Sequence, residues 1–240
     1  MTGVILKRDA IKNGLIDRMV QSVREDGFIN PVSEAERLES LQSIMVDHVR
    51  GESVWVFGYG SLMWNPAFYH IEKCSGIVHG YHRSYCMWTA GGRGTPELPG
   101  MMLGMDRGGA CRGMVFRIAP DQVDEELDIV WRREMIGQAY RARWVTARTG
   151  RKMLRAITFV IDRRYIRYAG RVPRDVQVAH IATAAGRMGS CREYLENTVA
   201  HLDELGIGKG PMHDMLERVR GYDGPVPQGR WEKGRWQARR

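Results

Sequence analysis

The sequence of 240 residues predicts an α+β fold in which helices pack on a mixed, largely antiparallel β-sheet or barrel. Three observations lead to this class. Short apolar runs separated by glycine-rich turns fill the middle of the chain, as is typical of strands, whereas helical spacing of apolar residues occurs mainly nearer the ends. Regular alternation of strands and helices, which would indicate a parallel sheet, is missing. A hydrophobic content of 43% suffices for a real core.

The first 50 residues predict a helical N-terminal extension. Ser33 followed by Glu36 forms a capping box, which is a signal for a helix start. An apolar stripe at helical spacing follows it, formed by Leu38, Leu41, Met45 and Val49. We expect no signal peptide and no membrane partner, because charged residues interrupt the N-terminus and no apolar run approaches the roughly 20 residues of a membrane-spanning helix.

Strands are expected from residue 54 onward. Val54-Trp-Val-Phe57 predicts a strand that runs into a glycine-punctuated turn at 58–62. Further strands are expected at 76–88, 101–105, 111–118, 140–147 and 154–161. Since the chain has no internal repeat and no Pro/Ser-rich linker, we expect a single domain over 1–240, with an N-terminal extension at 1–50, a core at 53–220 and a basic tail at 221–240. The last part of this tail, 229–240, is expected to be frayed or loosely docked.

Two helices complete the prediction. Pro120 opens the first, whose apolar side is formed by Val123, Leu127, Val130 and Trp131. Ser190 caps the second, with Glu193 three residues later, and Gly206 ends it.

Positive charge is concentrated in one stretch of the chain. The net charge is +8, and residues 141–174 contain eleven Arg or Lys and one Asp. Such a stretch attracts phosphates, but it equally forms a solvated face beside small anionic ligands. Because the apolar run 156–161 predicts a buried strand within it and no nucleic-acid-binding motif accompanies it, we do not expect nucleic acid as a partner.

Cysteine and histidine spacing does not indicate a metal site. The four cysteines lie far apart without a CxxC pair, so we expect reduced thiols and a cytoplasmic protein. His79 and His82 lie three residues apart in an expected strand, which places them on opposite faces. We therefore expect no metal and no cofactor.

The turn after the first strand, Phe57-Gly-Tyr-Gly-Ser-Leu62, is a candidate anion site. Glycine lets the backbone turn sharply and approach a ligand, so backbone amides beside the Ser61 hydroxyl would form a nest for a carboxylate or phosphate. The turn lacks the signatures of a P-loop, a dinucleotide-binding loop and a hydrolase nucleophile elbow. The pattern alone fits an anion site and a structural turn equally well.

Glu134 is the candidate general base. It continues the apolar stripe of its helix by one further step, so helical geometry turns its carboxylate toward the apolar side. Desolvation there would raise its pKa, as a group that accepts and then donates a proton at neutral pH requires. The alternatives are a salt bridge with Arg132 or Arg133, or an exposed residue in the last helical turn.

Six motifs are spread over about residues 53–220. They are Tyr59-Gly-Ser-Leu62, Gly80-Tyr-His-Arg-Ser-Tyr-Cys86, Gly92-Arg-Gly-Thr-Pro96, Pro99-Gly-Met-Met-Leu103, Trp131-Arg-Arg-Glu-Met135 and Tyr194-Leu-Glu-Asn-Thr-Val199. Together, and in this order, they resemble the ChaC family of glutathione-specific γ-glutamylcyclotransferases.

The resemblance implies a γ-glutamylcyclotransferase-like fold and the conversion of glutathione to 5-oxoproline and Cys-Gly in the cytoplasm. It implies that Glu134 is the catalytic glutamate and that Tyr59, Gly60, Ser61 and Leu62 form the γ-glutamyl-binding loop. One departure from the family pattern is Gly137-Gln-Ala-Tyr140, where a glycine pair often precedes the tyrosine. Lactam formation on other γ-glutamyl amino acids or amines is the nearest alternative, and a non-catalytic module that binds anions or nucleic acid is another.

Two further residues are candidate substrate anchors, Arg83 and Tyr140. Arg83 fits a surface ion pair equally well. The glycine-rich segment 91–96 is either a mobile flap over the site or a long turn.

Overall fold

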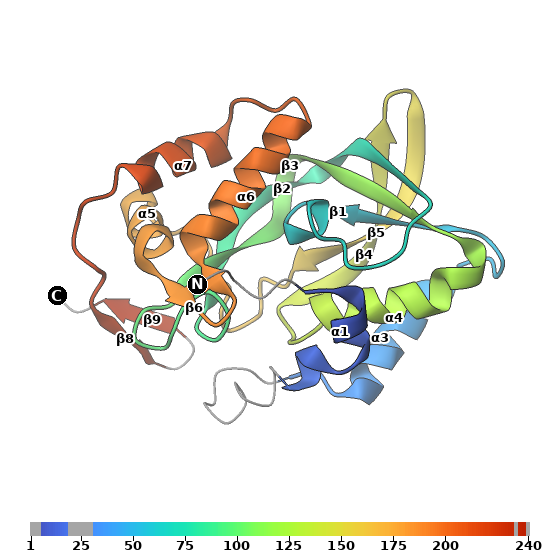
Figure 1. Cartoon of the computed structure of the whole chain (residues 1–240), viewed down its shortest axis with the longest axis horizontal. Coiled ribbons are helices and arrows are strands. Elements are labelled where there is room, and N and C mark those ends of the chain that lie inside the picture. Colours follow the sequence, from blue (N-terminus) through green and yellow to red (C-terminus); the bar gives the residue numbers. More distant parts are fainter. Residues whose placement is uncertain (1–5, 19–30, 233–234, 239–240) are drawn as a thin grey trace. The chain divides into compact units, whose positions relative to one another are not determined.

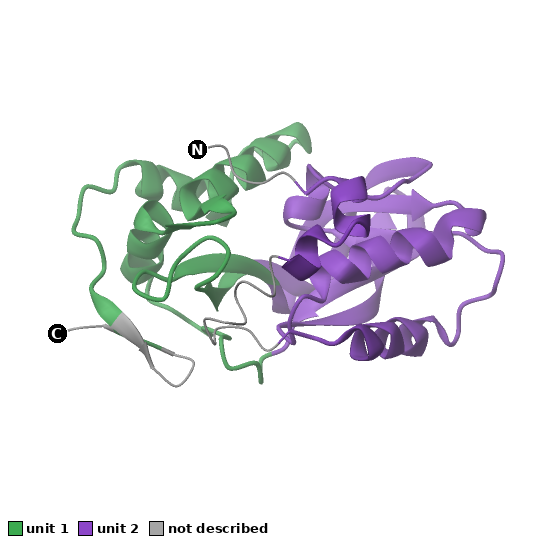
Figure 2. Cartoon of the chain, turned by 60° about the horizontal axis from the view of Figure 1, so that its bottom comes forward, with its two compact units in different colours: residues 1–5, 84–104, 163–240 green, residues 6–83, 105–162 purple. Residues whose placement is uncertain are grey.

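The computed structural model describes residues 6–18, 31–232 and 235–238. The chain divides into two compact units (Figure 2). One unit contains residues 6–83 and 105–162, and we call it the barrel unit. The other contains residues 84–104 and the described part of 163–240, and we call it the helical unit. The expectation of a single domain stays a prediction.

Five strands form a closed barrel in the order β1-β3-β2-β4-β5 (Figure 1). Their bounds are Val54–Gly58 for β1, Glu72–Thr89 for β2, Gly100–Ile118 for β3, Tyr140–Thr149 for β4 and Lys152–Ile161 for β5. Strand β1 is antiparallel to β3 but parallel to β5, and β4 is antiparallel to β5. This architecture confirms the predicted mixed, largely antiparallel barrel with surrounding helices.

The strands expected at 101–105 and 111–118 are one continuous strand, β3. Gly108 and Gly109 adopt positive φ angles of 99° and 70°, so the backbone bends there without ending the strand. Gly113 lies where β1 and β3 approach closely, because a Cβ built on it would collide with the Gly58 carbonyl oxygen. The run 156–161 of β5 is buried, as predicted, although basic residues flank it.

Helix α4 (Val123–Glu134) follows a 3₁₀ turn, η2 (Pro120–Gln122), and packs on the barrel with its predicted apolar face. Trp131 is fully buried, and its ring meets Phe159 of β5 edge to face at 5.0 Å. The last residue of α4 is Glu134, so packing of this helix on the barrel decides where that carboxylate lies.

The N-terminal extension contributes α1 (Arg8–Lys12) and α3 (Glu34–Met45) to the barrel unit. The predicted capping box of Ser33 and Glu36 is confirmed. The predicted stripe is only partly packed, because Leu41 and Met45 are half-buried whereas Leu38 and Val49 are exposed, and Val49 lies beyond the helix. The helix instead turns Arg37, Ser40 and Ile44 toward its neighbours: the Trp131 indole N–H donates to Ser40 Oγ, and the Trp144 indole N–H donates to the Ile44 carbonyl. Polar partners thus override the apolar pattern.

The helical unit contains three helices, α5 (Arg174–Thr183), α6 (Cys191–Glu204) and α7 (Pro211–Arg220). Helix α6 begins at the predicted cap, where Ser190 accepts a hydrogen bond from the Glu193 amide. The described residues of the tail include a hairpin of β8 (Gly229–Glu232) and β9 (Arg235–Ala238). A two-residue ladder, β6 (Ala185–Gly186) with β7 (Gly189–Ser190), precedes α6.

Segment 91–96 is bonded to residues near the start of α6. The Arg93 side chain donates to the Ser190 carbonyl, and the Cys191 thiol donates to the Arg93 carbonyl at 3.1 Å. The Met188 amide donates to the Gly92 carbonyl. These contacts favour an ordered turn for this segment.

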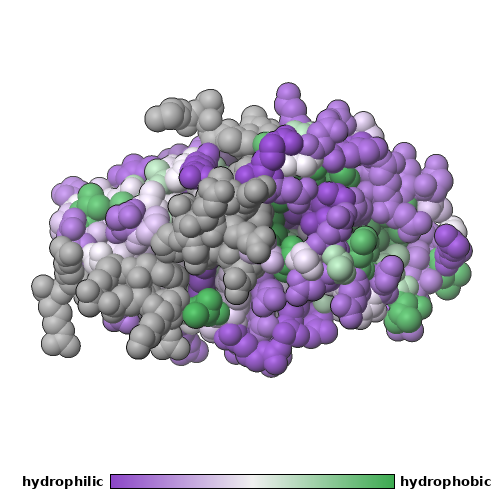
Figure 3. All heavy atoms as spheres, turned by 90° about the horizontal axis from the view of Figure 1, so that it is seen from below, coloured by the Kyte–Doolittle hydropathy of each residue, from purple (hydrophilic) through white to green (hydrophobic). Residues whose placement is uncertain are grey.

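On the face in Figure 3, hydrophilic residues predominate among those described, and hydrophobic residues form small separate patches. Among the described helices, none is long and apolar enough to cross a membrane.

Candidate active site

The turn between β1 and the following 3₁₀ helix, η1 (Ser61–Met63), is tightly folded. A Cβ built on Gly58 would lie 2.7 Å from Leu62 Cβ, so a residue with a side chain at position 58 would displace the turn. The Met63 amide donates to the Gly60 carbonyl, and the Asn65 amide donates to the Ser61 carbonyl. Leu62 is buried beneath the turn. These contacts therefore fix the backbone that carries the Ser61 side chain.

Tyr59 anchors this turn to the barrel. Its side chain belongs to the barrel core, and its hydroxyl donates to the Phe159 carbonyl at 2.8 Å. Arg83 of β2 holds the same turn from another side, since its Nε donates to the Tyr59 carbonyl at 2.6 Å and its Nη2 donates to the Arg112 carbonyl. Within 6–18, 31–232 and 235–238, the partners of the Arg83 guanidinium are these backbone carbonyls and the Met63 sulfur, and no carboxylate. Its role as a substrate anchor stays a prediction.

Glu134 lies at the C-terminal end of α4 with its side chain only 17% exposed. Burial raises the pKa of Glu134, and the adjacent Arg133 cation opposes that rise without cancelling it. The Arg133 Nε lies 3.1 Å from Glu134 Oε1. Desolvation and a salt bridge, which the sequence offered as alternatives for this residue, therefore occur together. A carboxylate of raised pKa is suited to accept a proton near neutral pH.

Arg133 brings the two candidate features together. Its side chain is 4% exposed, and its Nη2 donates to Ser61 Oγ at 2.8 Å. Its Nη1 donates to the carbonyls of Asn65 and Pro66. One guanidinium thus bridges the turn after β1 and the glutamate at the end of α4. The sequence interpretation named Arg133 only as a salt-bridge partner. Its position three residues after Val130 of the predicted apolar stripe is the sequence signal that could have turned it toward the core.

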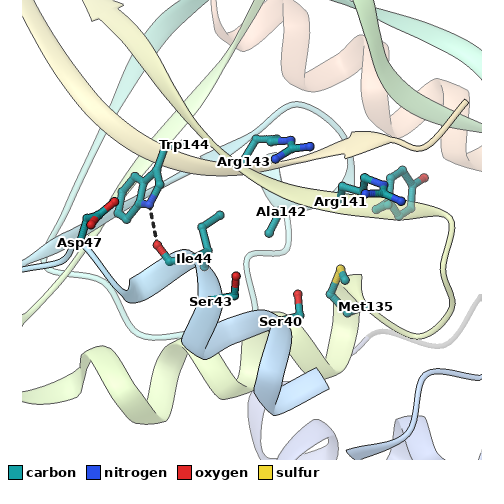
Figure 4. Close-up of a pocket in the computed structure, with 10 residues that line it drawn as sticks. Ser40, Ser43, Ile44, Asp47, Met135, Arg141, Ala142, Arg143 and Trp144 are labelled. Atoms are coloured by element: carbon teal, nitrogen blue, oxygen red, sulfur yellow. Dashed lines mark hydrogen bonds between the residues drawn. The ribbon is translucent and has the colours of Figure 1, made fainter. Parts of the chain in front are cut away.

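Tyr140 lies at the start of β4, on the wall of a cavity of about 490 Å³ between α3 and β4 (Figure 4). Met135, the residue after Glu134, is on the same wall. The full lining is Ser40, Ser43, Ile44, Asp47, Met135, Tyr140, Arg141, Ala142, Arg143 and Trp144. The structure thus places Tyr140 near the end of the helix that carries Glu134, and its contact with substrate stays a prediction.

The arrangement provides acid–base and hydrogen-bonding groups. Glu134 is a proton acceptor, and the Ser61 hydroxyl is a donor for an anion or a polarised carbonyl. In the described part of the chain, no group of three or more His, Cys, Asp or Glu residues is placed to hold a metal ion.

Comparison with known proteins identifies the family. The model of the ChaC-like protein family matches residues 54–222. The chain belongs to the ChaC family. The match includes the turn 59–62, Arg83, Glu134 and Tyr140, whereas α1 and α3 lie outside it.

Members of the ChaC family with curated names are similar over much of the chain. A glutathione-specific γ-glutamylcyclotransferase of Escherichia coli is 35% identical over 190 residues, which cover 78% of this chain and 82% of that protein. Glutathione-specific γ-glutamylcyclotransferase 1 of Mus musculus is 31% identical over 60% of this chain and 67% of its own. The crystal structure of a glutathione-specific γ-glutamylcyclotransferase from yeast superimposes with a TM-score of 0.64 at 21% identity, covering 71% of this chain and 96% of that chain. The last comparison confirms the γ-glutamylcyclotransferase-like fold.

Proposed function

We propose that this protein is a glutathione-specific γ-glutamylcyclotransferase that converts glutathione to 5-oxoproline and Cys-Gly in the cytoplasm. The observation that carries the proposal is the buried Glu134, joined through Arg133 to Ser61 of the turn after β1. The names of the E. coli and mouse relatives support glutathione as the substrate.

The reaction is an intramolecular acyl transfer. The α-amine nitrogen of the γ-glutamyl group attacks its own γ-carbonyl carbon, and a five-membered lactam closes. Holding the substrate folded makes this step efficient, because both reacting groups belong to one molecule. Glu134 accepts the proton that the amine loses and delivers it to the cysteinyl nitrogen as the bond from that nitrogen to the γ-carbonyl carbon breaks. No proton is gained or lost overall, and 5-oxoproline and Cys-Gly leave.

The turn 59–62 binds the γ-glutamyl group in this proposal. Ser61 Oγ accepts a hydrogen bond from Arg133, so its own O–H is directed elsewhere. That O–H donates either to the α-carboxylate of the substrate or to the oxyanion that develops on the γ-carbonyl oxygen. Arg83 supports the turn from β2, and Tyr140 is a second candidate contact.

Mass spectrometry of glutathione incubations tests the proposal. Wild-type protein should form 5-oxoproline and Cys-Gly in equal amounts, and Glu134→Gln should lower turnover by about 10²-fold or more, because the amide keeps the shape of the side chain and cannot accept the proton. Asp124→Asn is the matched control, since Asp124 is exposed on the same helix. Turnover near wild type in Glu134→Gln would remove this residue from the mechanism.

Substrate competition tests the glutathione preference. Preferred turnover of γ-glutamyl-alanine would redirect the same chemistry to other γ-glutamyl compounds. Salt-sensitive retention of RNA without any turnover would instead favour a binding module.

A further inference from the structure

We infer that Arg133 is the positioning residue of this site: its guanidinium holds Ser61 and Glu134 in one reactive arrangement. This inference deepens the proposed function and rests on it. The roles predicted for the turn and for Glu134 do not by themselves require a contact with Arg133, because the backbone could have positioned each of them separately.

The contacts of the Arg133 guanidinium support this role. The guanidinium is planar and carries N–H groups on three nitrogens, and all three nitrogens have partners. Nη2 contacts Ser61 Oγ, Nη1 contacts the carbonyls of Asn65 and Pro66, and Nε faces Glu134 Oε1. The residue is almost fully buried, so these contacts replace solvent. A lysine has one nitrogen and cannot reproduce this set.

The Ser61 hydroxyl is oriented by its contact with Arg133. Since Ser61 Oγ accepts from a cation, its hydrogen is directed away from Arg133. A hydroxyl that accepts a charge-assisted hydrogen bond is itself a stronger donor. Arg133 therefore orients Ser61 as a donor toward the γ-glutamyl group and strengthens it.

Glu134 is also in contact with Arg133. The ion pair with Arg133 involves Oε1, and in this proposal Oε2 accepts the proton of the substrate amine. Burial raises the pKa of Glu134, and the Arg133 cation opposes that rise. The ion pair thus favours the ionised form of the base.

The neighbouring Arg132 provides a matched control. It lies on the same helix, but it pairs with Asp128 at 2.7 Å and with Asp17 at 3.5 Å. Its remaining ion pair, to Glu34, also belongs to the contact between helices. Replacing Arg132 therefore removes an arginine from α4 and leaves the contacts of Arg133 with Ser61 and Glu134 in place.

The pH dependence of kcat/KM for glutathione tests the inference. We expect Arg133→Met to lower kcat by about 10²-fold. The acid limb, which is the rise of kcat/KM with pH on the low-pH side of the profile, should move upward by about one pH unit. Arg133→Lys should keep the acid limb near that of the wild type and still lose about 10-fold in kcat. The lysine ammonium keeps the positive charge but cannot make the hydrogen bonds of the planar guanidinium to several partners at once. Arg132→Met should leave kcat within about 2-fold of the wild type and should not move the acid limb. An unchanged acid limb in a folded Arg133→Met variant would overturn the inference.

A double-mutant cycle tests the link to Ser61. If Arg133 acts through Ser61, the effects of Ser61→Ala and Arg133→Lys on kcat are less than multiplicative in the combined variant. Fully multiplicative effects would show that the two residues act independently, against the inference. Circular dichroism and thermal unfolding of each variant show that it is folded.

Carbon-13 NMR titration of the Glu134 carboxyl separates this inference from the proposed function. The signal is assigned by its loss in Glu134→Gln, and its titration needs no turnover. If wild-type protein does not convert glutathione, the proposed function fails, and an upward shift of the titration in Arg133→Met still supports the coupling to Glu134. A titration that does not move would overturn the inference whatever the substrate is.

Discussion

Replacing Arg8 with methionine should strongly destabilise the barrel unit, although Arg8 lies outside the residues matched by the family model. Arg8 contacts Glu126 of α4 through two nitrogens, with Nε 3.0 Å and Nη2 2.6 Å from Oε1. Glu126 also accepts a hydrogen bond from the Tyr69 amide at 2.9 Å, and its side chain is only 1% exposed. The pKa of Arg8 is raised further by this pairing, so the cation is permanent.

The magnitude follows from what Arg8→Met leaves behind. Glu126 would remain buried with the Tyr69 amide and without its cation, and breaking a buried ion pair in this way costs about 3–5 kcal/mol. Lys12→Met is the control, because Lys12 and Glu125 form a pair with half-exposed side chains, 56% and 50%. Such a pair contributes about 0–1 kcal/mol.

Urea unfolding at pH 7, followed by circular dichroism and tryptophan fluorescence, measures both losses. The double variant Arg8→Met/Glu126→Met should recover most of the stability, since replacing both members of a buried pair by apolar residues is often close to neutral. A loss below about 1 kcal/mol in Arg8→Met, or a loss equal to that of Lys12→Met, would refute the reasoning.

Two further predictions concern the site. Because the pKa of Glu134 is raised by burial, the stability that its neutral form contributes is complete at low pH and is lost as the pH rises through the folded-state pKa. In urea unfolding, the stability of Glu134→Gln relative to wild type should therefore rise between about pH 4 and pH 7, because the amide has no charged form whose burial is unfavourable. Parallel pH curves of the two proteins would contradict this. Gly58→Ala should lower kcat/KM by about 10-fold or more, because its Cβ would strike Leu62 and displace Ser61, whereas Gly208→Ala, in open space, should not.

Much of the local structure was predictable from the sequence because local signals determine it. Apolar alternation and helical spacing placed the strands of the barrel and α4, and the caps at Ser33 and Ser190 placed two helix starts. The helical step from Trp131 to Glu134 also predicted that this carboxylate would be turned toward the core. These features depend on residues a few positions apart, so short-range geometry is sufficient.

Contacts between distant residues decided the rest. The pattern could not show that β1 pairs in parallel with β5, that α3 packs through Arg37 and Ser40, or that Arg83 bonds the Tyr59 carbonyl. The sequence by itself determined that strands form the middle of the chain, where two capped helices begin and which side of α4 carries Glu134. Only the tertiary structure decided that Arg133 joins Glu134 to Ser61, because that contact exists only once α4 packs beside the turn after β1.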